Sequence, residues 1–143
     1  MVCPLSPAQA ARLAQAPIAR LATADAAGQP HVIPVCYAFD GQHIYSVLDQ
    51  KPKRAPVLRL RRVRNIQTNP QVSLVVDHYD PDWRHLWYLL ITGAAQVLEP
   101  GAEQAGAIAL LRQKYPQYQQ MDIGGNPVIK ITPAAVVAWG DWS

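Results

Sequence analysis

The sequence contains a series of short segments rich in β-branched and aromatic residues, each bounded by turn residues such as glycine, proline, asparagine and aspartate. We expect strands at residues 18–24, 30–39, 43–48, 71–77, 86–98, 128–132 and 134–139. Because these strands follow one another through tight turns, without alternating strand and helix, the pattern predicts a mostly β protein. Six or seven antiparallel strands would form a closed or half-closed barrel with a few helices. The pattern disfavours a doubly wound sheet, and the chain lacks the GxGxxG motif of dinucleotide-binding folds.

Five single residues refine this expectation. Ser6 can cap a helix over 6–16, with Gln9 at the capping-box position. Pro34 cannot donate to a ladder, so the strand that contains it should lie at a sheet edge or carry a bulge. Gly93 predicts a bend or bulge within 86–98, and Pro133 should separate the last two strands. A second helix is expected at 101–115.

Length and composition predict a single domain spanning residues 1–143. Half of the residues are hydrophobic, which argues against disorder. The two cysteines, Cys3 and Cys36, form no metal-binding or disulfide pattern, so we expect free thiols in a reducing cytoplasm. The beginning of the chain does not resemble a signal peptide, and no apolar run is long enough to span a bilayer. These features predict a soluble cytoplasmic protein that binds no membrane.

The positive charge is concentrated in one stretch. Seven of the 13 lysines and arginines lie between Lys51 and Arg64, without an intervening acid. The net charge of the whole chain is +3, so the rest of the chain carries 3 − 7 = −4. A single basic stretch on an otherwise acidic protein favours a local anion site over a surface that binds nucleic acid generally.

This basic stretch also predicts a helix. Pro56 suits the first helical position, and Asn69 followed by Pro70 would end the helix. The cations at 51–54 would then precede a helix N-terminus, which itself favours anions. Apolar residues and arginines interleave over 57–66, and this mixture suggests that the helix contacts protein on more than one side, as at a subunit interface.

Three interpretations of the basic stretch follow: a site for a phosphate-bearing small molecule, a solvated basic helix, and a nucleic-acid-binding module. The first is favoured. Nucleic acid is disfavoured because aromatic residues such as Tyr45 and Trp87 do not alternate with the basic residues, as they would in a stacking platform.

Two longer patterns carry a family resemblance. The segment ARLAT…GxPHVxPV (19–35), followed by RNIxxNPxVSL (64–74), resembles the pyridoxamine-phosphate-oxidase-like split β-barrel superfamily of flavin and deazaflavin binders. The KPK tract at 51–53 and residues 77–98 resemble its probable coenzyme F-420-dependent branch. The resemblance implies a homodimer with FMN or F-420 at the subunit interface, acting as an oxidoreductase on a small organic substrate.

The resemblance also implies a set of cofactor-binding positions. The second strand would run along the cofactor ring, the end of the third strand would contact the ribityl chain or phosphate, and the basic residues would hold the phosphate. The positions are Pro34, Val35, Cys36, Ser46, Val47, Lys51, Lys53, Arg62 and Arg64. Arg62 stands where the family usually has lysine, and an arginine still binds phosphate. No catalytic residue is assigned, because the cofactor ring itself carries the hydride chemistry.

The remaining polar residues give weaker signals. His78 and His85, with Asp77, Asp80 and Asp82, predict a polar loop rather than a metal site, and no metal is expected. A non-catalytic flavin, deazaflavin or haem carrier is the main alternative function, and haem would need an axial ligand such as His78 or His85. We expect Trp83, Trp87 and Tyr88 either to close over the cofactor or to pack in the core or dimer interface.

Overall fold

The computed structural model describes residues 4–49 and 60–143. Its three helices and seven strands follow the order α1 (Pro7–Gln15), β1 (Ala19–Ala24), β2 (Pro30–Val35), β3 (Ala38–Phe39), β4 (Ile44–Val47), α2 (Arg61–Thr68), β5 (Gln71–His78), β6 (Trp87–Leu98), α3 (Ala102–Lys114) and β7 (Val128–Gly140). Short 3₁₀ turns occupy Trp83–His85 and Pro116–Gln120. No helix in these two described ranges is both long and apolar enough to cross a bilayer.

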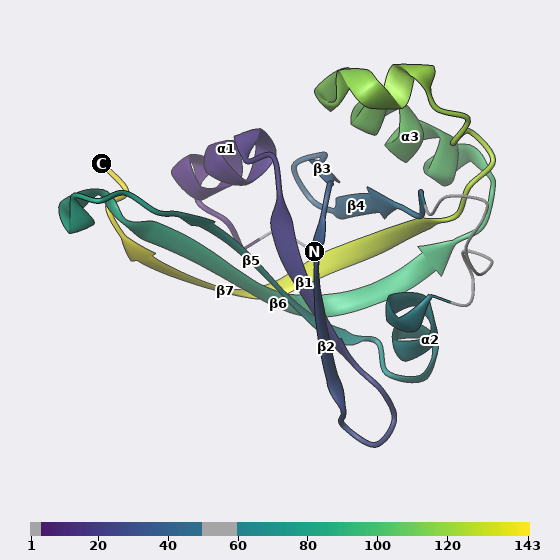
Figure 1. Cartoon of the computed structure of the whole chain (residues 1–143), viewed down its shortest axis with the longest axis horizontal. Helices are drawn as coiled ribbons and strands as arrows, with labels where there is room; N and C mark the ends of the chain where they lie inside the picture. The colour runs from purple at the N-terminus through teal and green to yellow at the C-terminus, as the bar shows by residue number, and fades with distance from the viewer. Residues whose placement is uncertain (1–3, 50–59) are drawn as a thin grey trace.

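All seven strands belong to one antiparallel sheet in the order β2-β1-β5-β6-β7-β4-β3. Figure 1 shows this sheet curled, with the helices placed at separate positions around it. The mostly β fold and the antiparallel half-closed barrel expected from the sequence are therefore confirmed.

The two edge strands of the sheet are consecutive in the chain. β2 ends at Val35 and β3 begins at Ala38, so only Cys36 and Tyr37 connect opposite ends of the strand order. Three residue steps span at most about 11 Å of extended chain. The sheet must therefore curl until its edges nearly meet. Because β3 pairs only with Ile44 and Tyr45, the rest of β4 lies at the sheet edge, and we call the place where it approaches β2 the seam.

The predicted strand at 30–39 is two strands, because the chain leaves one sheet edge and joins the other within it. The edge position expected from Pro34 is confirmed, since β2 has only β1 as a neighbour. The capping box of α1 is confirmed as well: the Gln9 backbone N–H donates to the Ser6 hydroxyl at 3.2 Å, and the Ser6 N–H donates to Gln9 Oε1 at 2.9 Å.

The separation expected at Pro133 is wrong, because β7 runs without a break from Val128 to Gly140. The pairing with β6 shifts at this point: Gly93 pairs with Pro133, whereas Thr92 pairs with Ala135, leaving one extra residue in β7. A bulge is one of the few places in a sheet that accepts proline, since no ladder donor is required there. The irregularity predicted at Gly93 is thus confirmed, and it accommodates Pro133 on the partner strand.

The helix expected from Pro56 begins later. Leu60 has an extended backbone (φ −59°, ψ 145°), and α2 starts at Arg61; Pro56 and the cations at 51–54 lie outside the described residues. Within α2 the faces are separated, with Val63, Asn65 and Ile66 buried. The mixture of apolar residues and arginines expected over 57–66 is therefore not seen within α2, and residues 57–59 lie outside the described residues.

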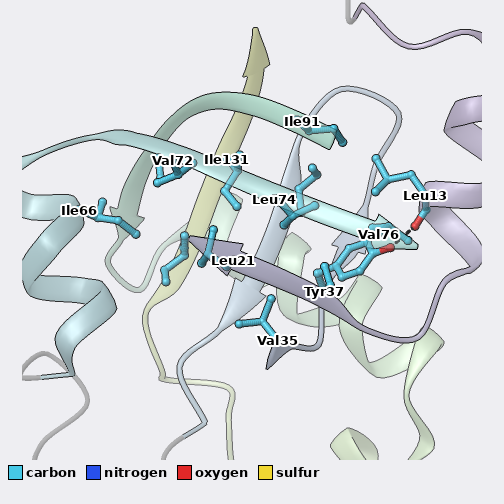
Figure 2. Close-up of a cluster of buried hydrophobic side chains, with 14 of the residues drawn as sticks. Leu13, Leu21, Val35, Tyr37, Ile66, Val72, Leu74, Val76, Ile91 and Ile131 are labelled. Carbon is cyan, nitrogen blue, oxygen red and sulfur yellow. Dashed lines mark hydrogen bonds between the residues drawn. The ribbon is translucent and has the colours of Figure 1, made fainter. Parts of the chain in front are cut away.

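A central hydrophobic cluster fills the curled sheet and includes residues of α1 and α2 (Figure 2). Its fully buried members include Leu13, Leu21, Tyr37, Leu74, Ile91 and Ile131. The Tyr37 hydroxyl donates to the Leu13 carbonyl at 2.5 Å, which ties α1 to the connection between β2 and β3. A second cluster packs α3 against β3, β4 and the start of β7. These two clusters hold the seam between them in a defined position.

Candidate functional site

A cavity of about 180 Å³ lies at the seam. Its walls come from the end of β2 with the following cysteine, from β4, from α2 and from the 3₁₀ turn after α3. The lining residues are Ile18, Pro34, Val35, Cys36, Ser46, Val47, Asp49, Arg62 and Tyr118. The cavity therefore exists because the fold brings two sheet edges together beside a short basic helix.

Six of the nine cofactor-binding positions implied by the resemblance line this one cavity: Pro34, Val35, Cys36, Ser46, Val47 and Arg62. Arg64 lines a different cavity, on another face of α2. Lys51 and Lys53 lie outside the described residues. The structure thus places the positions expected to contact the cofactor ring and its chain beside one arginine, Arg62, and it separates Arg64 from them.

The backbone at the seam is stabilised by side chains from the end of α3. The Tyr37 carbonyl accepts hydrogen bonds from Lys114 Nζ at 2.9 Å and from the Tyr115 hydroxyl at 3.1 Å. The Tyr37 N–H donates to the same Tyr115 oxygen at 3.1 Å. These bonds satisfy backbone groups between the strands that have no ladder partner, and they fix the position of Cys36.

Arg62 is the cation of the cavity. Its side chain is half-buried, and its Nε atom is buried without a hydrogen-bond partner among the described residues. Burial lowers the pKa of Arg62 below its ordinary value, and the negative charge of Asp49 acts in the opposite direction. An arginine remains charged under such conditions. A half-buried guanidinium whose buried Nε has no partner among the described residues is suited to bind an anionic group.

Asp49 and Tyr118 are members of the site that sequence reasoning missed. The Tyr118 hydroxyl donates to Asp49 Oδ2 at 2.7 Å. Burial raises the pKa of Tyr118 far above its ordinary value, and the bond to Asp49 adds to the effect. Asp49 is the only acid between residues 41 and 76, and its isolation beside the basic stretch could have marked it as a candidate site residue. Tyr118 lies 69 positions away from Asp49, and only the tertiary fold reveals their contact.

Ser46 contributes a hydroxyl-bearing residue to the cavity wall. The residue is 3% exposed and lines the cavity. Val35 and Val47, 7% and 2% exposed, form apolar wall on either side of the seam. The cavity therefore combines apolar walls with a cation, a carboxylate and a hydroxyl.

A larger, open cavity of about 460 Å³ lies between the β1–β2 turn and the opposite face of α2. Arg61, Arg64 and Asp25 all line it. Asp25 Oδ1 accepts the N–H groups of Ala27 and Gln29 at 2.9 Å each, so this carboxylate stabilises the turn. The two arginines here are exposed, unlike Arg62.

The aromatic and histidine residues of the loop at 78–88 do not line the seam cavity. His78 stacks on Trp87, with ring centroids 6.1 Å apart, and Tyr88 stacks on Trp139 at 5.7 Å. Trp83 is 71% exposed. Within 4–49 and 60–143 no group of three or more His, Cys, Asp or Glu side chains is arranged to hold a metal ion.

Solved structures of several proteins share this fold. The conserved hypothetical protein Rv2991 of Mycobacterium tuberculosis has a TM-score of 0.76 at 21% identity, covering 96% of this chain and 86% of that one. An F420 reductase has a TM-score of 0.62 at 21% identity, covering 87% and 93%. The haem storage protein HutZ of Vibrio cholerae has a TM-score of 0.67 at 18% identity, covering 88% and 87%.

The amino-acid sequence is also similar to that of a reductase. The 5a,11a-dehydrotetracycline/5a,11a-dehydrooxytetracycline reductase of Streptomyces rimosus subsp. rimosus is 29% identical over 124 residues, which are 85% of this chain and 72% of the relative. The sequence pattern of the family described as pyridoxamine 5'-phosphate oxidase matches residues 5–140. With the split-barrel fold and a match over nearly its whole length, this chain belongs to the pyridoxamine 5'-phosphate oxidase family.

Proposed function

We propose that this chain is an oxidoreductase that binds a phosphate-bearing flavin-type cofactor, coenzyme F-420 or FMN, at the seam cavity. One observation carries the proposal: six positions implied by the family resemblance line a single cavity. The cavity contains Arg62, whose buried Nε has no hydrogen-bond partner among the described residues. A flavin or deazaflavin needs an apolar slot for its ring and a cation for its phosphate, and this cavity offers both.

Each group has a role in this proposal. Pro34, Val35 and Cys36 line the ring, with the edge position of β2 leaving backbone groups free to meet the polar side of the ring. Ser46 and Val47 contact the chain between ring and phosphate, and Arg62 pairs with the phosphate. Lys51, Lys53 and Arg64 remain predicted phosphate ligands: the two lysines lie outside the described residues, and Arg64 would have to act from another face of α2.

The cavity is smaller than a complete site. Pockets for ligands of cofactor size usually measure about 300–1,000 Å³, whereas the seam cavity measures about 180 Å³. We therefore propose that a second copy of the chain completes the pocket, as in the homodimer that the resemblance implies.

The cofactor, when bound, supplies hydride or electron transfer to a small organic substrate. The residues of this chain bind and orient the cofactor and exclude water from one side of it. The tetracycline reductase of S. rimosus supports a reductive reaction, and the solved F420 reductase supports the deazaflavin as the preferred cofactor.

The binding part of the proposal is tested by titrating purified protein with FMN and with F-420 and following cofactor absorbance and fluorescence. We expect saturable binding of at least one of them. Arg62→Met should weaken binding by about 1–3 kcal/mol, because a hydrogen bond to a charged group is lost, and Lys53→Met is predicted to do the same. Oxidation of the reduced cofactor by a substrate would then show turnover.

Arg84→Met provides the matched control. Arg84 is an exposed arginine whose guanidinium pairs with Asp82 at 2.7 Å, away from the seam, so its loss should leave cofactor affinity unchanged. Equal affinity of wild type and the Arg62 variant would contradict the phosphate assignment.

The same preparation separates the enzyme from a carrier and from a nucleic-acid-binding module. A protein that binds the cofactor without turnover would be a flavin or deazaflavin carrier, and a Soret band on haem addition would indicate a haem carrier. Strongly salt-dependent binding to oligonucleotides, in a protein that binds no flavin, would indicate that the basic stretch at 51–64 binds nucleic acid.

A further inference from the structure

Asp49 introduces a negative charge into a cavity whose arginine is suited to an anion. It lies two residues after the end of β4, and the Tyr118 hydroxyl donates to its Oδ2 oxygen at 2.7 Å. Asp49 and Arg62 line the same cavity and attract each other, yet they form no ion pair within 4.0 Å among the described residues. Since the two charged groups are separate, each is available to a different part of one ligand.

The free hydrogen-bonding capacity of the cavity is therefore of two kinds. Arg62 offers a donor at Nε. Asp49 offers its Oδ1 oxygen, which accepts no hydrogen bond from a described residue, and a carboxylate can accept several. Ser46 also lines the cavity, and a serine hydroxyl can act as donor or acceptor. A bare phosphate would pair with Arg62 but would be repelled by Asp49, and it would leave the carboxylate unused.

We infer that Asp49 selects a ligand whose anionic group is joined to a hydroxylated chain: the hydroxyls donate to Asp49 while the anion pairs with Arg62. This inference rests on the proposed function, and it names the chemical feature by which the cavity distinguishes a polyol phosphate from a free phosphate. Tyr118 acts as a positioning residue, because its hydroxyl fixes the orientation of the carboxylate.

The test compares wild type with Asp49→Asn, which keeps the shape of the side chain and removes its charge. The probes are FMN, riboflavin, which lacks the phosphate, lumiflavin, which lacks the hydroxylated chain, and inorganic phosphate as a competitor. If only the deazaflavin binds, F-420 and its phosphate-free deazariboflavin core replace FMN and riboflavin. Affinities are measured by quenching of ring fluorescence.

We expect Asp49→Asn to weaken the binding of riboflavin, or of the phosphate-free deazaflavin core, about tenfold or more. The reason is that hydrogen bonds to a charged acceptor are lost. Lumiflavin should bind within about twofold of wild type, because it carries no hydroxyls for Asp49 to bind. Inorganic phosphate should compete with the flavin at least about threefold better in the variant than in wild type, because the negative charge that repels phosphate near Arg62 is gone. A change in the same direction for the phosphate-free flavin and inorganic phosphate, or none for either, would overturn the inference.

Two further variants separate this effect from general damage. Tyr118→Phe should weaken the binding of the phosphate-free flavin without strengthening the binding of phosphate, because the carboxylate keeps its charge but loses its fixed orientation. An unchanged affinity for the phosphate-free flavin would contradict the positioning role. Asp122→Asn removes an exposed carboxylate and should change nothing. If Asp49→Asn does not fold, as judged by thermal denaturation, Tyr118→Phe still decides. If wild type binds neither FMN nor F-420, the proposed function fails first and this inference falls with it.

Discussion

Lys114 shows how one half-buried charged residue supports the backbone at the seam. Its ammonium donates to the Tyr37 carbonyl at 2.9 Å and lies 3.9 Å from the centroid of the Tyr37 ring. Both contacts favour the charged form, whereas burial lowers the pKa of Lys114 from 10.5 to about 8, against an opposing effect of Cys36. The side chain therefore stabilises the backbone at the seam, while burial of its charge lowers the free energy of unfolding by an amount that depends on pH.

This cost gives a prediction of pH dependence. Between about pH 8 and pH 10.5 the unfolded chain binds a proton at Lys114 that the folded chain has lost, so this residue makes the free energy of unfolding rise with pH. Below pH 8 both states are protonated and the contribution is constant. Urea unfolding of wild type and Lys114→Met at pH 7.5 and 9.5 measures it. Wild type should gain stability relative to the variant at the higher pH, and a constant difference would contradict the lowered pKa.

At the residue scale, six residues predicted from the sequence line one cavity, and whether they bind a cofactor stays a prediction. Pro34 through Cys36 and Ser46 with Val47 were predicted because the resemblance covers both sides of the seam. Asp49 and Tyr118 were missed because their contact depends on how the 3₁₀ turn after α3 packs, which no local pattern encodes. Asn65 is 2% exposed and donates to the Thr23 hydroxyl at 2.9 Å, which attaches α2 to β1.

Among the elements, the β6–β7 pair depends on one glycine. A Cβ atom at Gly93 would lie far inside contact distance of the Thr132 carbonyl oxygen. Gly93→Ala should therefore lower the free energy of unfolding by about 1–3 kcal/mol or more, because the bulge beside Pro133 must shift.

Gly106→Ala is the control. A Cβ atom there meets nothing within 4 Å, and alanine in helix α3 should raise the free energy of unfolding by about 0.5–1 kcal/mol. Thermal or urea unfolding measures both. Equal effects would show that the close packing at the bulge does not limit the sheet.

Prediction of the elements succeeded where turn chemistry and β-branched runs coincide, and it failed where tertiary contacts override a local signal. Pro133 reads as a strand break, but the bulge opposite Gly93 accepts it. The helix predicted from Pro56 onward is described only as α2, which begins at Arg61 after an extended Leu60; Pro56 itself lies outside the described residues. In the sequence, the connection between β2 and β3 looks like part of one continuous strand, because residues with high β-propensity continue through it. In the structure, the hydrogen-bond partners change at this connection.

For the whole molecule, the end of the β6–β7 pair is exposed and apolar. Val137 and Trp139 alternate on β7 and are each 52% exposed. Beyond Ile131, β7 pairs with no second strand among the described residues. Exposed apolar residues on an open sheet edge are typical of an interface, and we propose that this surface takes part in the homodimer.

The dimer is tested by sedimentation of wild type and Trp139→Glu at matched concentrations. We expect wild type to sediment as a dimer and the variant to shift toward monomer, because a charge would be buried in an apolar contact. Ala109→Glu, on an exposed face of α3, should leave the dimer intact. A wild-type monomer would contradict the proposed second subunit, and an unshifted variant would place the interface elsewhere.

The most direct test of the proposed site is a structure determined with FMN or F-420 bound. We predict that the phosphate contacts the Arg62 guanidinium, that the ring lies along Pro34–Cys36, and that a hydroxyl of the connecting chain donates to Asp49. A cofactor bound with its phosphate out of contact with Arg62, or bound away from the seam, would contradict the assignment of this cavity.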